Sequence, residues 1–169
     1  MDISVNLAPG HSKGLYLSNP VMTSAGTFGS DGYGSGLPSD FPFHELGAIV
    51  LKSTTLLPRL GNSEPHMEEQ PSGWLNAVGL KNPGIYDLMD NVLPLFADLN
   101  VPIILSLAAD SYEDFIALAQ IASGVASIDA IELNFGCPNT ASGLDFGQNA
   151  EAARRVTQDV KALVNMPVI

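Results

Sequence analysis

The side chains able to do chemistry in this sequence follow short apolar segments instead of lying inside them. Lys52 comes directly after the apolar residues 49–51 and precedes Ser53, while Cys137 lies within the polar run 134–139. An ammonium group there could bind a carboxylate, and a thiol, with an unperturbed pKa of about 8.5, could act as a general base. Lysines usually reach into solvent and free cysteines usually pack as small apolar residues. The polar, Pro and Gly neighbours favour functional roles for both.

Asparagine is the other residue type that gathers at these places. The planar amides of Asn76, Asn134 and Asn139 could read the donors and acceptors of a small heterocycle. The three histidines lie in separate segments, and the single cysteine has no partner at CxxC spacing, so no metal site is expected.

Short apolar segments rich in Val, Ile and Leu alternate with helix-like stretches. Continuous apolar runs of this length are typical of strands buried on both faces of a parallel sheet. Capping residues and apolar spacing predict helices that begin near residues 83, 111 and 149, with Pro94 disturbing the last turn of the first. The expected strands are residues 20–23, 47–51, 101–105, 130–133 and 166–169.

This alternation predicts βα units that build a parallel sheet. Residues 3–7 and 15–17 alternate around Pro9 and Gly10, which predicts a small hairpin ahead of the sheet. A doubly wound dinucleotide fold is the alternative, because residues 29–36 are rich in glycine. Two prolines follow where the phosphate-binding helix would begin, so a loop beside the site is favoured.

Composition excludes several classes of protein. The 169 residues are 46% hydrophobic, enough to bury a core, and the net charge of −11 argues against binding to nucleic acids or anionic membranes. One cysteine excludes an internal disulfide. Because the start has no basic, apolar leader and no apolar run approaches the roughly 20 residues of a membrane helix, we expect a cytoplasmic protein.

Four ordered motifs resemble those of class 1 dihydroorotate dehydrogenases, over nearly the whole chain. They comprise residues 19–29, 52–62, 75–84 and 132–139. The stretches at 28–29 and 58–59 look most like class 1B, in which a partner subunit with FAD and an iron–sulfur cluster passes electrons to NAD. The resemblance implies oxidation of (S)-dihydroorotate to orotate in pyrimidine biosynthesis, with FMN as the hydride acceptor.

The resemblance also implies a role for each matching residue. Cys137 would be the catalytic base, and Lys52 would contact both the flavin and the substrate carboxylate. The substrate would further be bound by Asn76, Val78, Gly79, Leu80, Asn134 and Asn139. The flavin would further be held by Ser24, Ala25, Gly26, Ser53 and Asn134. This chain has Ser24-Ala25-Gly26 where the family usually has Ala-Ser-Gly, so one hydroxyl contact to the flavin is displaced.

The family fold is a (β/α)8 TIM barrel, whose eight strands need about 250 residues. Four full strands and the opening of a fifth are predicted here. Residues 1–169 are therefore expected to form one incomplete domain, the amino-terminal portion of the flavin-binding barrel after a short β-hairpin, and to be inactive alone. The complete enzyme is expected to be a homodimer or a heterotetramer.

Two other interpretations stay open. The flavin domain of dihydropyrimidine dehydrogenase shares the Asn-x-x-Cys-Pro motif but usually has His where this chain has Asn139. Alternatively, the chain is a naturally short half-barrel that acts as a non-catalytic binding or assembly module.

Overall fold

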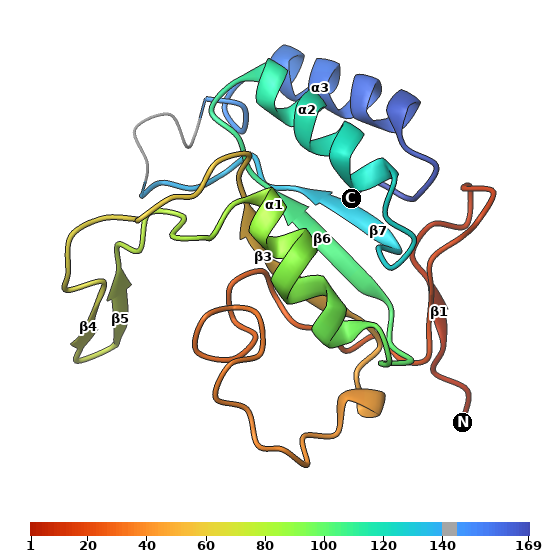
Figure 1. The fold of residues 1–169 in the computed structure, drawn as a ribbon, viewed down its shortest axis with the longest axis horizontal. Helices are drawn as coiled ribbons and strands as arrows, with labels where there is room; N and C mark the ends of the chain where they lie inside the picture. Colours follow the sequence, from red (N-terminus) through yellow and green to blue (C-terminus); the bar gives the residue numbers. More distant parts are fainter. Residues whose placement is uncertain (140–144) are drawn as a thin grey trace.

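A small parallel sheet forms the centre of the computed structural model, which describes residues 1–139 and 145–169 (Figure 1). The strands are β1 (Val5–Asn6), β2 (Tyr16–Leu17), β3 (Ile49–Thr54), β4 (Met67–Gln70), β5 (Gly73–Asn76), β6 (Ile103–Leu107) and β7 (Ala130–Leu133). The helical elements are η1 (Phe43–Glu45), α1 (Ile85–Asp87), η2 (Leu88–Val92), η3 (Leu93–Phe96), α2 (Tyr112–Ser123) and α3 (Ala150–Leu163).

The sheet has the strand order of a βα barrel. β3, β6 and β7 are parallel neighbours in chain order, which confirms the three central predicted strands. Single parallel bridges extend the sheet on both sides, from Met22 to Ala48 and from Val168 to Ile131. The first and fifth expected strands are thus reduced to one bridge each.

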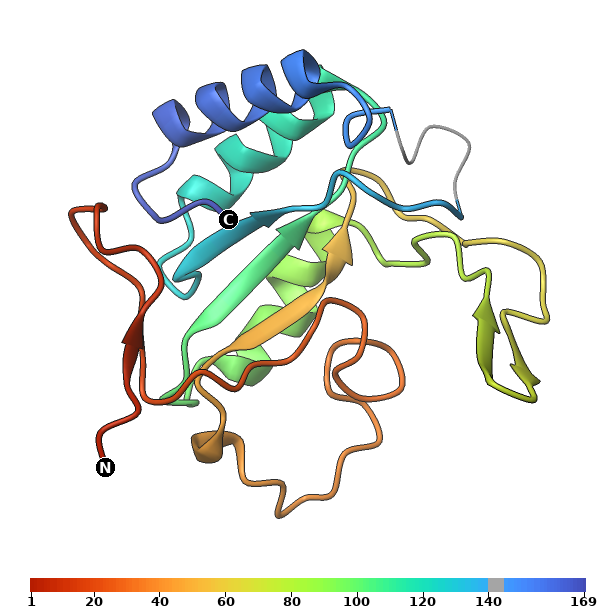
Figure 2. The ribbon, with the colours of Figure 1, turned by 180° about the vertical axis from the view of Figure 1, so that it is seen from behind.

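The two faces of the sheet pack against different parts of the chain. The helices cover one face, as the views from the front and from behind agree (Figures 1 and 2). On the other face, Val50, Ile104 and Ala130 pack against Leu15 and Leu17. The predicted amino-terminal hairpin is confirmed as β1 paired with β2, and it closes the amino-terminal end of this inner face.

The predicted helices and the predicted cap at Ser111 are also confirmed. The Ser111 hydroxyl accepts a hydrogen bond from the Asp114 N–H at the start of α2, and the Asn149 side chain caps α3 in the same way. The first helical stretch begins at Ile85 and passes from α1 through η2 to η3. Pro94 lies in η3, so the disturbed last turn is a 3₁₀ helix.

The segment between β3 and the first helix contains a hairpin that the sequence analysis missed. β4 and β5 pair antiparallel and project away from the sheet (Figure 2). The sequence alone favours packing over loop anchoring for Trp74 and Phe28. Trp74 is instead 62% exposed in β5, because no further layer of the described residues covers this hairpin. Phe28 is buried as expected, against Phe41, Phe43 and Phe96.

Within residues 1–139 and 145–169, no helix combines the length and the apolar character needed to cross a bilayer.

Candidate active site at the carboxyl ends of the strands

The inner face of the sheet changes from apolar to polar toward the carboxyl ends of its strands. β3 and β6 lose their regular register between Leu51 and Thr54, and bulges of this kind often redirect side chains beside active sites. The Ser53 hydroxyl oxygen lies 2.9 Å from that of Ser106 on β6. The Asn134 side-chain amide, just after β7, donates to Ser53 at 2.8 Å. Three neighbouring strands are therefore linked by polar side chains at this level.

Ser106 is a site residue that the sequence analysis missed. It is fully buried, and it is the one polar residue of β6. A single serine at an inward position of an otherwise apolar strand was the signal that could have identified it, because a buried hydroxyl needs a hydrogen-bond partner.

Lys52 is half-buried beneath the glycine-rich loop that follows residue 26. Its backbone N–H donates to the Gly32 carbonyl at 3.2 Å, and a Cβ at Gly32 would lie only 2.7 Å from the Lys52 Cβ. Partial burial lowers the pKa of Lys52, and the nearby Lys81 lowers it further, while Asp31 acts in the opposite direction. The close approach explains why glycine is required at position 32.

The turn expected to touch the flavin lies beside Lys52. The Thr27 hydroxyl donates to the Ser24 carbonyl at 2.8 Å, and Gly26 takes the left-handed conformation with φ of 83°. A Cβ at Gly26 would lie 3.9 Å from the Lys52 Cγ. Ser24 and Gly26 are exposed, and Ala25 is half-buried, so the turn offers accessible backbone at the edge of the site.

Two of the predicted substrate asparagines meet directly. The Asn139 side-chain amide donates to the Asn76 side-chain oxygen at 2.8 Å, which joins the loop after β7 to the end of β5. Asn62, which was not assigned a role from the sequence, donates its own amide to the Asn139 carbonyl at 3.0 Å. The three asparagines therefore form one cluster.

The backbone of residues 78–80, expected to bind the substrate carboxylate, forms an unusual turn. Gly79 and Leu80 both take left-handed conformations, with φ of 73° and 56°, which is uncommon for leucine. Among the residues that the structure describes, the N–H groups of Val78, Gly79 and Leu80 donate no hydrogen bond. Successive backbone N–H groups left unpaired in a turn are typical of anion-binding concavities.

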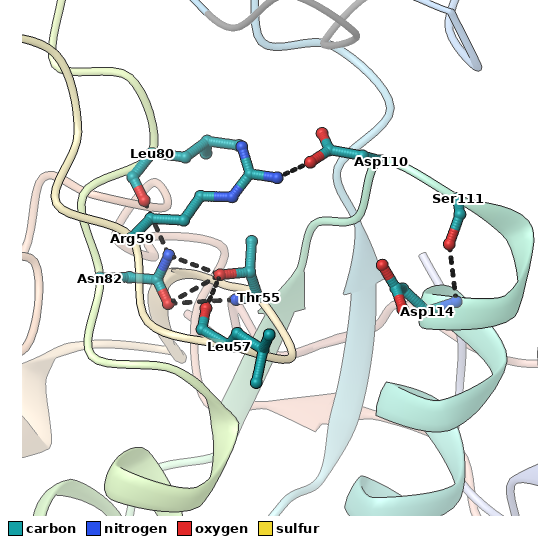
Figure 3. Close-up of polar contacts among 8 residues, drawn as sticks. All are labelled: Thr55, Leu57, Arg59, Leu80, Asn82, Asp110, Ser111 and Asp114. Atoms are coloured by element: carbon teal, nitrogen blue, oxygen red, sulfur yellow. Dashed lines mark hydrogen bonds and ion pairs between the residues drawn. The ribbon is translucent and has the colours of Figure 1, made fainter.

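Asn82 fixes this loop to the end of β3, as Figure 3 shows. Its side chain is 6% exposed; it accepts from the Thr55 and Gly84 N–H groups and donates to the Leu80 carbonyl at 2.7 Å. Its backbone forms a bridge with Arg59, whose guanidinium is paired with Asp110 after β6.

Substitution Asn82→Ala is expected to lower the free energy of unfolding by about 1–3 kcal/mol, because the buried Thr55 N–H would lose its acceptor. Unfolding in urea measures this change. Asn91→Ala is the matched control: among the described residues this exposed amide donates to Asp87 alone, and we expect its effect to stay within about 0.5 kcal/mol. Equal effects of the two substitutions would contradict the role of Asn82.

Cys137 lies on the loop after β7, between the two asparagines that make contacts in the site. It is half-buried. The Gly136 N–H donates to the Asn134 side-chain oxygen at 3.0 Å, which turns the amide nitrogen of Asn134 toward Ser53. Residues 140–144, which follow Asn139 in the sequence, lie outside the described part of the chain. Within the described part, no group of His, Cys, Asp and Glu is arranged to hold a metal ion.

The structure therefore brings the predicted residues together in two groups. Ser53 and Asn134 are hydrogen-bonded to each other, with Lys52 next to Ser53 on β3, and Asn76 is hydrogen-bonded to Asn139. Cys137 lies on the loop that connects the two groups. This arrangement at the carboxyl ends of parallel strands is where βα barrels place their chemistry.

Comparison with known proteins agrees with this geometry. Residues 10–169 match the family model described as "Dihydroorotate dehydrogenase". The chain is 40% identical, over 156 residues, to the "Dihydroorotate dehydrogenase B (NAD(+)), catalytic subunit" of Halalkalibacterium halodurans and 41% identical, over 158 residues, to that of Latilactobacillus sakei. Each alignment covers 92% of this chain and 50% of the relative, so the chain spans about half the length of these relatives.

A solved structure supports the fold. The crystal structure of DHODH in complex with ferulenol from Eimeria tenella superposes with a TM-score of 0.70, at 18% identity, over 96% of this chain and 44% of that chain. The architecture is that of a TIM barrel. The chain belongs to the dihydroorotate dehydrogenase family.

Proposed function

We propose that this chain is the amino-terminal half of an FMN-dependent dihydroorotate dehydrogenase, which oxidises (S)-dihydroorotate to orotate in pyrimidine biosynthesis. The observation that carries the proposal is the side-chain hydrogen bond between Asn76 and Asn139, which lies two residues after Cys137. The left-handed turn at Gly79 and Leu80, expected to present N–H groups to a carboxylate, supports it. Family membership and the class 1B names of its relatives support it.

The residues present fit a flavin. Lys52, Ser53, Ser106 and Asn134 form a polar layer at the mouth of the inner face, and the turn at Gly26 leaves open backbone beside them. Ser24, Ala25, Gly26, Lys52, Ser53 and Asn134 would hold FMN. When bound, FMN supplies the hydride acceptor.

The chain's own residues would remove the proton, bind the substrate carboxylate and orient the ring. Cys137, as thiolate, removes the proton from the substrate carbon. The Lys52 ammonium and the N–H groups of 78–80 bind the substrate carboxylate, while the amides of the asparagines orient the pyrimidine ring. Because Asn139 and Asn76 contact each other, binding the ring requires both loops to be in place.

The test is anaerobic mixing of the complete, FMN-loaded enzyme with dihydroorotate. We expect the flavin absorbance to bleach while one orotate forms for each flavin reduced. Dihydrouracil is the control, because it has the same ring without the carboxylate, and it should not bleach the flavin. Bleaching by dihydrouracil alone would favour a dihydropyrimidine dehydrogenase-like domain, and no bleaching by either would favour the non-catalytic module.

Partners follow from the same proposal. The relatives are named as catalytic subunits, which implies a second subunit for them. We propose an electron-transfer subunit with FAD and an iron–sulfur cluster, in a heterotetramer built on a homodimer, working in the cytoplasm.

Lys52→Ala is expected to weaken both flavin and orotate binding, each by roughly 10- to 150-fold, because loss of a charge-assisted hydrogen bond costs about 1.5–3 kcal/mol. Titrations of FMN and orotate measure both constants. Unchanged Kd values for FMN and orotate would show that Lys52 binds neither the flavin nor the substrate.

Because the Lys52 ammonium is proposed to bind the substrate, the KM for dihydroorotate should depend on pH. Burial and Lys81 lower the pKa of Lys52, so its proton is lost at a lower pH than in an ordinary lysine. Since only the protonated form attracts the carboxylate, the KM for dihydroorotate should rise as pH increases through this lowered pKa. Lys52→Arg keeps its charge at high pH and should abolish this alkaline rise.

A further inference from the structure

Asn62 holds together two loops that the proposed function uses. Its side-chain nitrogen donates to the Ala77 carbonyl at 2.9 Å and to the Asn139 carbonyl at 3.0 Å. Ala77 directly follows Asn76 in the chain, and the second acceptor is the carbonyl of Asn139 itself. A single primary amide thus reaches both sides of the contact that orients the ring.

The orientation of this amide is fixed. A carbonyl oxygen can only accept, so both side-chain N–H groups of Asn62 are used, one for each loop. The Asn62 N–H also donates to the Val78 carbonyl at 3.1 Å, and the His66 ring nitrogen lies 2.7 Å from the Asn62 carbonyl, to which it donates. Asn62 is therefore held on the backbone side as well.

One side of the Asn62 amide packs against Gly79. A Cβ at Gly79 would lie 2.8 to 2.9 Å from three atoms of the Asn62 amide, closer than real Cβ atoms approach. Gly79 is buried and has φ of 73°, so two independent constraints require glycine there. The residue expected to offer its N–H to the carboxylate is thus packed directly against Asn62.

We propose that Asn62 is a positioning residue that sets the spacing between the Asn76 and Asn139 amides and the register of the N–H groups of 78–80. Asn62 is exposed and lies on neither of the two loops, so it acts through them on the substrate. This inference rests on the proposed function, in which these groups bind dihydroorotate. Its effect falls on substrate affinity, because the residues proposed to bind the flavin, such as Ser53 on β3 and Asn134 after β7, are not among its hydrogen-bond partners.

The test compares Asn62→Ala and Asn62→Asp with the wild-type complete enzyme. We expect both variants to raise the KM for dihydroorotate and the Kd for orotate about tenfold, while FMN content and melting temperature stay unchanged. The Asp variant keeps the shape but cannot donate, so it should be at least as impaired as the Ala variant. Asn91→Ala, which removes an exposed amide bonded only to Asp87, should change neither constant.

Hydrogen exchange supplies a readout that needs no turnover. Loss of the two hydrogen bonds should speed exchange of the amides in residues 61–80 in both variants and leave α2 unaffected. A wild-type enzyme that fails to oxidise dihydroorotate would overturn the proposed function, but the exchange result would still decide whether Asn62 joins the loops. An Asp variant with wild-type KM and Kd, or faster exchange without any change in either constant, would overturn the proposal.

Discussion

Replacement of Cys137 by serine is expected to slow dihydroorotate oxidation in the complete enzyme by about 10²- to 10⁴-fold near neutral pH, while FMN stays bound. General-base catalysis contributes an effect of this size, and a serine hydroxyl has a far higher pKa than a thiol in the same position. Contacts of Asn134, Gly136 and Asn139 hold this loop on either side of position 137, and serine has nearly the same shape as cysteine, so we expect the loop geometry to survive the substitution. Stopped-flow measurement of flavin reduction isolates the affected step.

The pH profile separates a lost base from a distorted loop. Rates of the Cys137→Ser variant should rise continuously with pH, since a serine hydroxyl must be deprotonated to act as a base. Cys137→Ala, which has no ionisable group, should lack this rise. Wild-type rates in the serine variant near neutral pH would exclude Cys137 as the base.

The 169-residue chain without the rest of the barrel is expected to show no dihydroorotate oxidation and to bind no stoichiometric FMN. In the described residues the central sheet has only three full strands, and its two outer segments pair through single bridges. The polar layer of Lys52, Ser53 and Ser106 therefore faces no opposing strands. The edges expose apolar side chains, with Val21 60% and Ile169 50% exposed, which favours self-association.

Sedimentation with added FMN, together with a turnover assay, tests this expectation. The complete enzyme at the same concentration is the control, and it should sediment with bound flavin and turn over. Addition of the carboxyl-terminal half as a separate chain should restore part of the activity if the two halves pair. A stable monomer of 169 residues that holds one FMN and oxidises dihydroorotate would contradict the half-barrel interpretation.

The order and types of the residues determined the central strands, the starts of the helices and the family. The apolar segments gave β3, β6 and β7 because strands buried on both faces need continuous apolar residues, whatever they pair with. Ser111 and Asn149 identified the starts of α2 and α3, since capping is a contact between near neighbours in the chain. The motifs around Lys52, Asn76 and Cys137 identified the family.

Where the sequence analysis failed, the missing information was the environment of a residue. Trp74 was expected to pack because tryptophan usually does, yet β4 and β5 project from the fold and leave it exposed. No pattern within residues 67–76 reports whether another layer covers a hairpin. The same applies to Met22 and Val168, whose segments look like strands but pair at a single position.

The contacts that build the site were decided by tertiary structure alone. Ser53 meets Ser106 across 53 residues of chain and Asn134 across 81, while Asn62 meets Asn139 across 77. Periodicity reports which face of an element is buried, whereas these bonds depend on the bulge in β3 and on the path of each loop. The sequence by itself therefore identified most residues of the candidate site, through their types and motifs. The folded chain added Ser106 and Asn62 and decided which residues share a hydrogen bond, because that depends on distances between elements remote in the chain.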